Sequence, residues 1–188
     1  MSPPTVLVVD DQPNVAEAYE LFLPDEYETR VATGGEAALE LMDADVDVVL
    51  LDRRMPDVTG DEVLERIREA GYDARVAMVT AVDPDLDVLG LGFDDYLVKP
   101  VDREDVRGTV SDLLSIATYA TEVQEYFALA RKRATVEGST PTRDLTADDR
   151  YQDLVERTEE LKARVDETFE ALDEEAQTGA FNEFPGGD

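Results

Sequence analysis

The chain has 188 residues, which fits one ordinary domain plus an extension better than two full-sized domains. Its formal net charge of −29, from 46 acidic and 17 basic side chains, argues against direct binding to nucleic acid, because phosphate contacts require clustered Lys and Arg. Cysteine and histidine are absent, which excludes disulfides, thiolate metal sites and histidine-based catalysis, so any chemistry must use carboxylates, hydroxyls, Lys or Arg.

The acidic residues are spread along the whole chain, and only three of the 17 basic residues are Lys. This composition is typical of a salt-adapted protein, with an ordinary acidic protein as the alternative. At molar salt the Debye length falls to about 3 Å, which would screen the self-repulsion of such a surface. No segment approaches the roughly 18 consecutive apolar residues of a membrane span, and the N-terminus does not resemble a signal peptide. We therefore expect a cytoplasmic protein without a membrane partner.

The first 118 residues alternate between strand and helix patterns. Unbroken apolar runs are typical of strands covered on both faces, and helical spacing of apolar residues separates them. In chain order the predicted elements are a strand at 6–9, a helix at 15–23, a strand at 29–32, a helix at 37–42, a strand at 46–51, a helix at 63–70, strands at 76–79 and 96–98, and a helix at 106–117. Capping boxes are predicted at 33–36, 59–62 and 102–105. This alternation predicts a doubly wound α/β domain with a parallel sheet.

The character of the chain changes after residue 118. Apolar residues at helical spacing from Ile116 to Ala130 predict that the helix at 106–117 runs on, and a capping box at 146–149 predicts a further helix. The seam of that helix consists of Tyr151, Leu154, Thr158, Leu161, Val165, Thr168 and Leu172. Two of these positions are Thr, which makes a weak coiled-coil seam. We expect an α/β domain at 1–118, an acidic helical domain at 119–176 and a disordered tail at 177–188. The two helices could pair within one chain or between two.

Polar side chains follow the predicted strands at the points where these strands end. Asp10 and Asp11 follow the first strand, Asp52 the third, Thr80 the fourth and Lys99 the fifth. In an open α/β sheet, ligands bind beyond the carboxyl ends of the strands, so we expect these groups to converge. Clustered carboxylates repel one another, and without His or Cys their natural partner is a hard cation such as Mg²⁺. Taken singly, each residue is more often a turn, a cap or a structural group.

Four segments together closely resemble the receiver domain of two-component response regulators, over about residues 4–118: Val8–Asp11, Leu51–Gly60, Val79–Ala81 and Asp95–Pro100. The resemblance implies a flavodoxin-like sheet of five parallel strands in the order 2-1-3-4-5. It also implies that a histidine kinase is the partner that donates a phosphoryl group. The chain would then be a phosphoacceptor that assists its own phosphorylation and dephosphorylation, and not an enzyme.

The resemblance also assigns roles to individual residues. Asp52 would be the phosphoacceptor, Lys99 would pair with the phosphoryl group, Thr80 would hydrogen-bond it, and Tyr96 would be the aromatic switch residue. The Mg²⁺ ligands would be Asp10, Asp11, Asp52 and the backbone carbonyl of Arg54. A cis bond would join Lys99 to Pro100. Phosphoryl transfer needs positioning and charge neutralisation more than a general base, so the missing His is no obstacle.

Two parts of the chain qualify this resemblance. Between Thr80 and Tyr96 the chain is about one helical turn shorter than usual for receivers, and two glycines weaken any helix there. We therefore expect a short fourth helix and doubt dimerisation through it.

The extension resembles the HalX-type domain that follows receivers in haloarchaea. Residues 119–188 hold 8 basic and 18 acidic side chains, a net charge of −10, which makes a DNA-reading helix-turn-helix improbable.

We interpret the chain as a response regulator of a two-component phosphorelay, phosphorylated on Asp52 with Mg²⁺, whose helical extension passes the state to an unidentified protein partner. One alternative is a phosphate sink or relay intermediate in which the extension only forms a homodimer. A Mg²⁺-dependent aspartyl-phosphate hydrolase is a third reading, but its usual D-x-D motif is missing because Asp52 is followed by Arg53 and Arg54. The cognate kinase, the stimulus, the output partner and the oligomeric state stay open.

Overall fold

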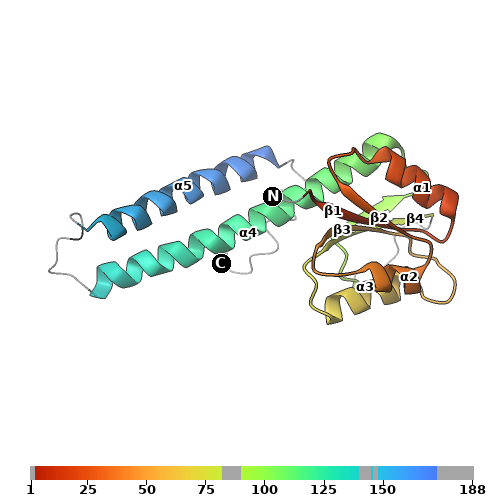
Figure 1. Ribbon diagram of the computed structural model, residues 1–188, viewed down its shortest axis with the longest axis horizontal. Helices are drawn as coiled ribbons and strands as arrows, with labels where there is room; N and C mark the ends of the chain where they lie inside the picture. Colours follow the sequence, from red (N-terminus) through yellow and green to blue (C-terminus); the bar gives the residue numbers. More distant parts are fainter. Residues whose placement is uncertain (1–2, 82–89, 140–144, 146–147, 173–188) are drawn as a thin grey trace. The chain divides into compact units, whose positions relative to one another are not determined.

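A computed structural model describes residues 3–81, 90–139, 145 and 148–172 (Figure 1). The chain divides into two compact units, Met1–Leu114 and Ser115–Asp188. The division falls inside one long helix, α4 (Arg103–Ser139), so that helix contributes its first turns to one unit and its remainder to the other.

The first unit is built on a sheet of five parallel strands in the order β2-β1-β3-β4-β5. The strands are β1 (Thr5–Val9), β2 (Glu28–Ala32), β3 (Val46–Leu51), β4 (Arg75–Thr80) and β5 (Asp95–Val98). Each lies within one residue of its predicted bounds, and the predicted parallel sheet and strand order are confirmed. Strands β1 and β4 are almost wholly buried, which explains why their sequences are unbroken apolar runs.

Helices cover both faces of this sheet. They are α1 (Pro13–Phe22) and the first turns of α4 on one face, and α2 (Gly35–Leu41) and α3 (Gly60–Glu69) on the other (Figure 1). Alternate residues of β1 face opposite layers, so Val6 and Val8 pack with α1 and α4 while Leu7 and Val9 pack with α2 and α3. Each fully buried side chain of this kind contributes about 1.5–3 kcal/mol, which makes the two layers the main source of stability.

The predicted capping boxes have different outcomes. Those at 59–62 and 102–105 are confirmed: Thr59 and Glu62 cap each other reciprocally, and Asp102 Oδ1 accepts the Asp105 N–H at 3.0 Å. The box at 33–36 is wrong, because the N-cap is Gly34 and has no side-chain hydrogen bond. Packing decides the start of α2 instead, since a Cβ on Gly35 would lie only 2.5 Å from the Val58 carbonyl oxygen.

A short fourth helix was predicted between β4 and β5, and residues 82–89, on which that prediction falls, lie outside the described residues. The described end of the segment between these strands is anchored by Asp94. The Asp94 carboxylate accepts hydrogen bonds from Arg68 Nη2 at 2.8 Å, Arg75 Nη1 at 2.9 Å and the Val76 N–H at 2.7 Å. These charge-assisted bonds fix the chain directly before β5 and therefore help to place the residues that follow it.

The second unit is a helical hairpin in which α4 packs against α5 (Asp149–Ala171). The pairing is antiparallel, because the Tyr119 and Phe169 rings contact each other in a tilted arrangement with centroids 5.5 Å apart, while Glu137 accepts a hydrogen bond from Tyr151. The two helices therefore pair within the chain. The prediction that the helix at 106–117 runs on is also confirmed. The capping residue predicted at 146 and the tail at 177–188 lie outside the described residues, and the N-cap of α5 is Asp148.

The seam of the hairpin combines apolar and polar contacts. The predicted α5 seam is buried or half-buried at all seven positions, with Thr158, Leu161 and Leu172 fully buried. Glu122 of α4 is only 7% exposed, and its carboxylate accepts hydrogen bonds from Arg164 at 2.6 Å and Thr168 at 2.8 Å. A buried charge needs such partners, so this cluster fixes how the two helices align.

Among the described residues, no helix is long and apolar enough to cross a membrane.

Candidate metal and phosphoacceptor site

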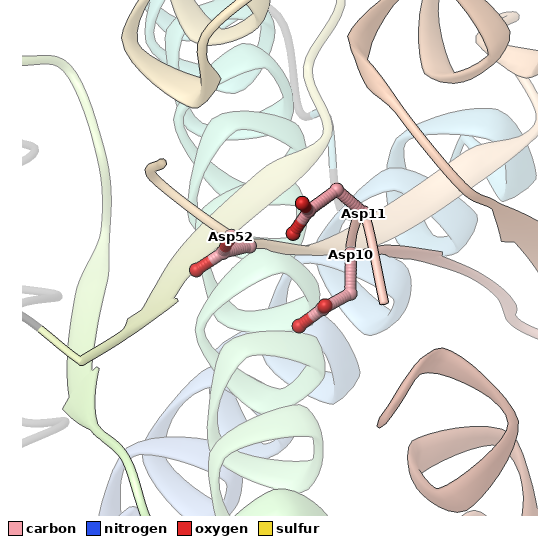
Figure 2. Close-up of side chains that lie close together, drawn as sticks. All are labelled: Asp10, Asp11 and Asp52. Atoms are coloured by element: carbon pink, nitrogen blue, oxygen red, sulfur yellow. The ribbon is translucent and has the colours of Figure 1, made fainter. Parts of the chain in front are cut away.

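Acidic side chains gather at the carboxyl end of the sheet. Asp10 and Asp11 follow β1, and Asp52 follows β3, the neighbouring strand. Figure 2 shows the three carboxylates lying close together, and each offers an oxygen within 4.8 Å of the others. Asp10 is 1% exposed and Asp52 6% exposed, whereas Asp11 is half-buried at the rim. Two of the three acids are thus held largely out of water.

Lys99 connects the last strand to these acids. Its Nζ lies 2.6 Å from Asp10 Oδ2 and 3.2 Å from Asp52 Oδ1, and its side chain is 17% exposed. The Lys99 backbone N–H donates to the Thr80 carbonyl at 2.8 Å, and the bond from Lys99 to Pro100 is cis. The other Asp10 oxygen, Oδ1, accepts the Gln12 N–H at 2.9 Å. The sequence-predicted Asp10, Asp52 and Lys99 therefore lie in one hydrogen-bonded group.

The charges in this group do not balance. Burial raises the pKa of Asp52, and the charges of Asp10 and Asp11 raise it further, while Lys99 opposes them. Burial by itself would lower the pKa of Lys99, but the hydrogen bond to Asp10 and the charges of Asp52 and Asp10 outweigh it and raise that pKa. Lys99 is thus held as an ammonium, and it pairs with two of the three carboxylates, Asp10 and Asp52.

The donor set suits a hard divalent cation. Carboxylate oxygens are the ligands that Mg²⁺ prefers, and a cation among the three acids would relieve the repulsion that raises the pKa of Asp52. Arg54, whose carbonyl the sequence adds to the ligands, lies two residues after Asp52 with an exposed side chain. The residues present therefore fit Mg²⁺.

Thr80 and Tyr96 stand on the two strands that complete this edge. Thr80 ends β4, is 1% exposed and pairs in register with Val98 of β5. Tyr96 lies on β5, half-buried, and its ring is 5.5 Å from that of Phe93. It packs against the apolar layer shared with α2 and α3. The roles assigned to these two residues stay predictions.

The loop after Asp52 contains contacts that sequence reasoning missed. Arg53 forms a two-pronged ion pair with Asp61, and Gly60 lies so close to β3 that a Cβ would be 2.3 Å from the Asp52 carbonyl oxygen. The ion pair joins residues eight apart across a loop, and no periodic pattern marks such a pair.

Comparison with known proteins assigns both parts of the chain. Residues 6–111 match the response regulator receiver domain, and residues 115–181 match the HalX domain. The receiver match covers more than half of the chain, and the fold and the acidic group at the sheet edge agree with it. The chain belongs to the response regulator receiver domain family and carries a HalX domain after the receiver.

Individual relatives support this assignment. A Haloferax volcanii protein named as a candidate transcriptional regulator is 48% identical over 159 residues, covering 84% of this chain and 27% of that protein. The response regulator TrrA from Thermotoga maritima, solved in complex with Mg²⁺-BeF, is 35% identical with a TM-score of 0.53, over 59% of this chain and 99% of that one. A receiver domain from a candidate LuxO repressor of Vibrio parahaemolyticus shares the fold at 24% identity and a TM-score of 0.59, over 64% of this chain and 96% of that one. This chain spans half or less of the length of the curated proteins it resembles.

Proposed function

We propose that the protein is a response regulator that accepts a phosphoryl group on Asp52 from a histidine kinase, in the presence of Mg²⁺. The observation that carries this proposal is the group formed by Asp10, Asp11, Asp52 and Lys99, in which a buried carboxylate lies beside two further acids and one ammonium. The similarity to a receiver solved with Mg²⁺-BeF supports the same assignment, because that protein is described as a Mg²⁺ complex.

The residues divide the chemistry between them. A carboxylate oxygen of Asp52 attacks the phosphorus of the donor, the bond from phosphorus to the donor nitrogen breaks, and the donor imidazole leaves with its electron pair. Lys99 is already within 3.2 Å of Asp52 and can neutralise the phosphoryl oxygens as they arrive. The hydroxyl of Thr80, at the end of β4, would donate a hydrogen bond to one of those oxygens. Mg²⁺, held by the three acids and the Arg54 carbonyl, would supply further charge neutralisation.

The HalX hairpin would pass the phosphorylation state to a protein partner. In this proposal the receiver spans residues 1–118, the helical domain residues 119–176 and the tail residues 177–188. The name of the Haloferax relative suggests that transcription is the final output. Because residues 119–188 carry a net charge of −10, we infer that the hairpin acts on transcription through a protein and not through DNA.

Phosphorylation with a small phosphodonor tests the proposal. Wild-type protein with acetyl phosphate and Mg²⁺ should gain one acid-stable, base-labile phosphoryl group, and Asp52→Asn should abolish it. Asp11→Ala should weaken Mg²⁺ binding severely. Asp45→Asn is the matched control, because Asp45 is exposed and precedes β3 instead of following it, so labelling should persist.

The outcomes separate the alternatives. Undiminished labelling of Asp52→Asn would refute the phosphoacceptor assignment. Normal labelling that leaves the association state and partner binding of the hairpin unchanged would favour the phosphate-sink reading. Catalytic turnover of a small phosphoester would favour the hydrolase.

A further inference from the structure

The loop from Asp52 to Gly60 leaves the end of β3 and returns to it at the start of α3. The two ends of the loop meet at a neck formed by Arg53 and Gly60, where the Gly60 N–H donates to the Arg53 carbonyl at 2.9 Å. A Cβ on Gly60 would lie 2.3 Å from the Asp52 carbonyl oxygen and 2.8 Å from Arg53 Cα, so the returning chain touches the backbone of the phosphoacceptor itself. Any movement of the neck must therefore move Asp52.

The body of this loop is held in a costly conformation. Asp57 has a positive φ of 65°, and the Val58 N–H donates to the Pro56 carbonyl at 2.8 Å, which together describe a tight γ-turn. Only Met55 and Val58 of the loop are anchored in the apolar layer. A strained segment persists only when its surroundings fix it, so the loop requires a restraint at its neck.

The Arg53–Asp61 ion pair provides that restraint. Arg53 Nε lies 3.0 Å from Asp61 Oδ1, and Nη2 lies 3.2 Å from Oδ2, so two parallel hydrogen bonds span the neck. The Arg53 side chain is only 12% exposed, which limits screening by salt. A guanidinium fork fixes the orientation of its partner carboxylate, whereas an ammonium would provide only a point charge.

We propose that Arg53 and Asp61 are positioning residues of the phosphoacceptor site: their fork closes the loop so that the Asp52 carboxylate and the Arg54 carbonyl are held in place beside Asp10 and Asp11. The proposal rests on the function proposed above. Arg53 directly follows Asp52 and directly precedes Arg54, so the fork acts on the one residue that joins both groups. The α3 end of the fork is itself fixed, because Asp61 lies inside the Thr59–Glu62 capping box.

Mg²⁺ titration of the metal-free protein in 2 M KCl tests the proposal without relying on activity. The variants are Arg53→Lys, which keeps the charge and removes the fork, and Asp61→Asn, which keeps the size and removes the charge. We expect the Kd for Mg²⁺ to rise on the order of tenfold in each, the loss typical of groups that orient metal ligands. Hydrogen exchange of the loop 53–60 should accelerate in the same variants before any metal is added.

Arg30→Lys is the matched control. Arg30 Nη1 pairs with Asp43 Oδ2 at 2.8 Å, and Asp43 precedes β3, so this variant makes the same Arg-to-Lys exchange in an ion pair at the other end of the strand. Its Kd for Mg²⁺ should stay within about twofold of wild type. The double variant Arg53→Lys/Asp61→Asn should bind Mg²⁺ no more weakly than the poorer single variant, because both changes remove one interaction.

A second measurement separates positioning from general stability. At subsaturating Mg²⁺ the phosphorylation rate of Arg53→Lys should fall in proportion to its affinity, and saturating Mg²⁺ should restore it. Unchanged Mg²⁺ affinity in both single variants, even with a lower Tm, would overturn the proposal, as would additive losses in the double variant. If wild-type protein took no phosphoryl group at Asp52, the proposed function would fail, and the Mg²⁺ affinities would still decide the positioning role.

Discussion

The close approach of Gly60 to β3 gives a prediction that can be worked from the coordinates. In Gly60→Ala the new methyl would meet the Asp52 carbonyl oxygen at 2.3 Å, whereas ordinary contact begins at 3.4 Å. The first turn of α3 must then move by about 1 Å, against a neck already fixed by the Arg53 carbonyl, and overpacking of this kind costs about 1–3 kcal/mol. The higher helix propensity of Ala offsets this loss of unfolding free energy by at most about 1 kcal/mol.

We therefore expect Gly60→Ala to lose about 2 kcal/mol of unfolding free energy, which lowers the Tm by roughly 10 °C for a unit of this size. Gly108→Ala is the control, because Gly108 is exposed within α4 and a Cβ there meets nothing within 4 Å. That change should stabilise the protein by about 0.5–1 kcal/mol. Thermal melts followed by circular dichroism in 2 M KCl make the comparison. Equal stabilisation by both substitutions would refute the close approach.

Three further predictions follow from charge and burial. Leu161→Asp should lower the unfolding free energy of the hairpin by several kcal/mol and reduce its helicity, while Ala163→Asp on the exposed face of α5 should not. Circular dichroism and sedimentation measure these effects. Continued phosphorylation at Asp52 in Leu161→Asp would show that the receiver folds independently. The Tm should rise between about 0.1 M and 2 M KCl, because a net charge of −29 repels itself, and a flat Tm would contradict salt adaptation. Asp52→Asn should raise the Tm of the metal-free protein at pH 7. The folded-state pKa of Asp52 is raised, so its ionisation destabilises the fold above that pKa, and the difference should vanish as the pH falls below the ordinary value of 3.8; a difference independent of pH would contradict this.

The elements that the sequence predicted are those whose pattern is local. Strand positions that are buried on both faces of a sheet favour apolar residues, so β1 and the buried stretches of β3 and β4 were visible as apolar runs, although Asp47 of β3 is exposed. The polar residues at their ends followed from topology, because parallel strands bring their carboxyl ends to one edge. For the same reason Asp10, Asp52 and Lys99 were expected together, and the structure places them within hydrogen-bonding distance. Their individual roles remain predictions.

The tertiary structure alone decided which distant residues meet. Gly34 caps α2 in place of a predicted Thr33 box, because the contact of Gly35 with Val58 sets where that helix begins. The fork between Arg53 and Asp61 spans a loop that no periodicity describes.

In the helical extension, too, some features follow from the sequence and others only from the tertiary structure. The sequence determined its two helices and the seam of α5, because their apolar spacing is periodic. It left open whether they pair within one chain or between two, since an apolar stripe on a helix does not specify which helix packs against it. The structure decides this by packing α4 against α5 in one chain, where the buried carboxylate of Glu122 meets Arg164 and Thr168. A buried charge is stable only at the alignment that supplies its partners, and that alignment exists only once the hairpin has formed.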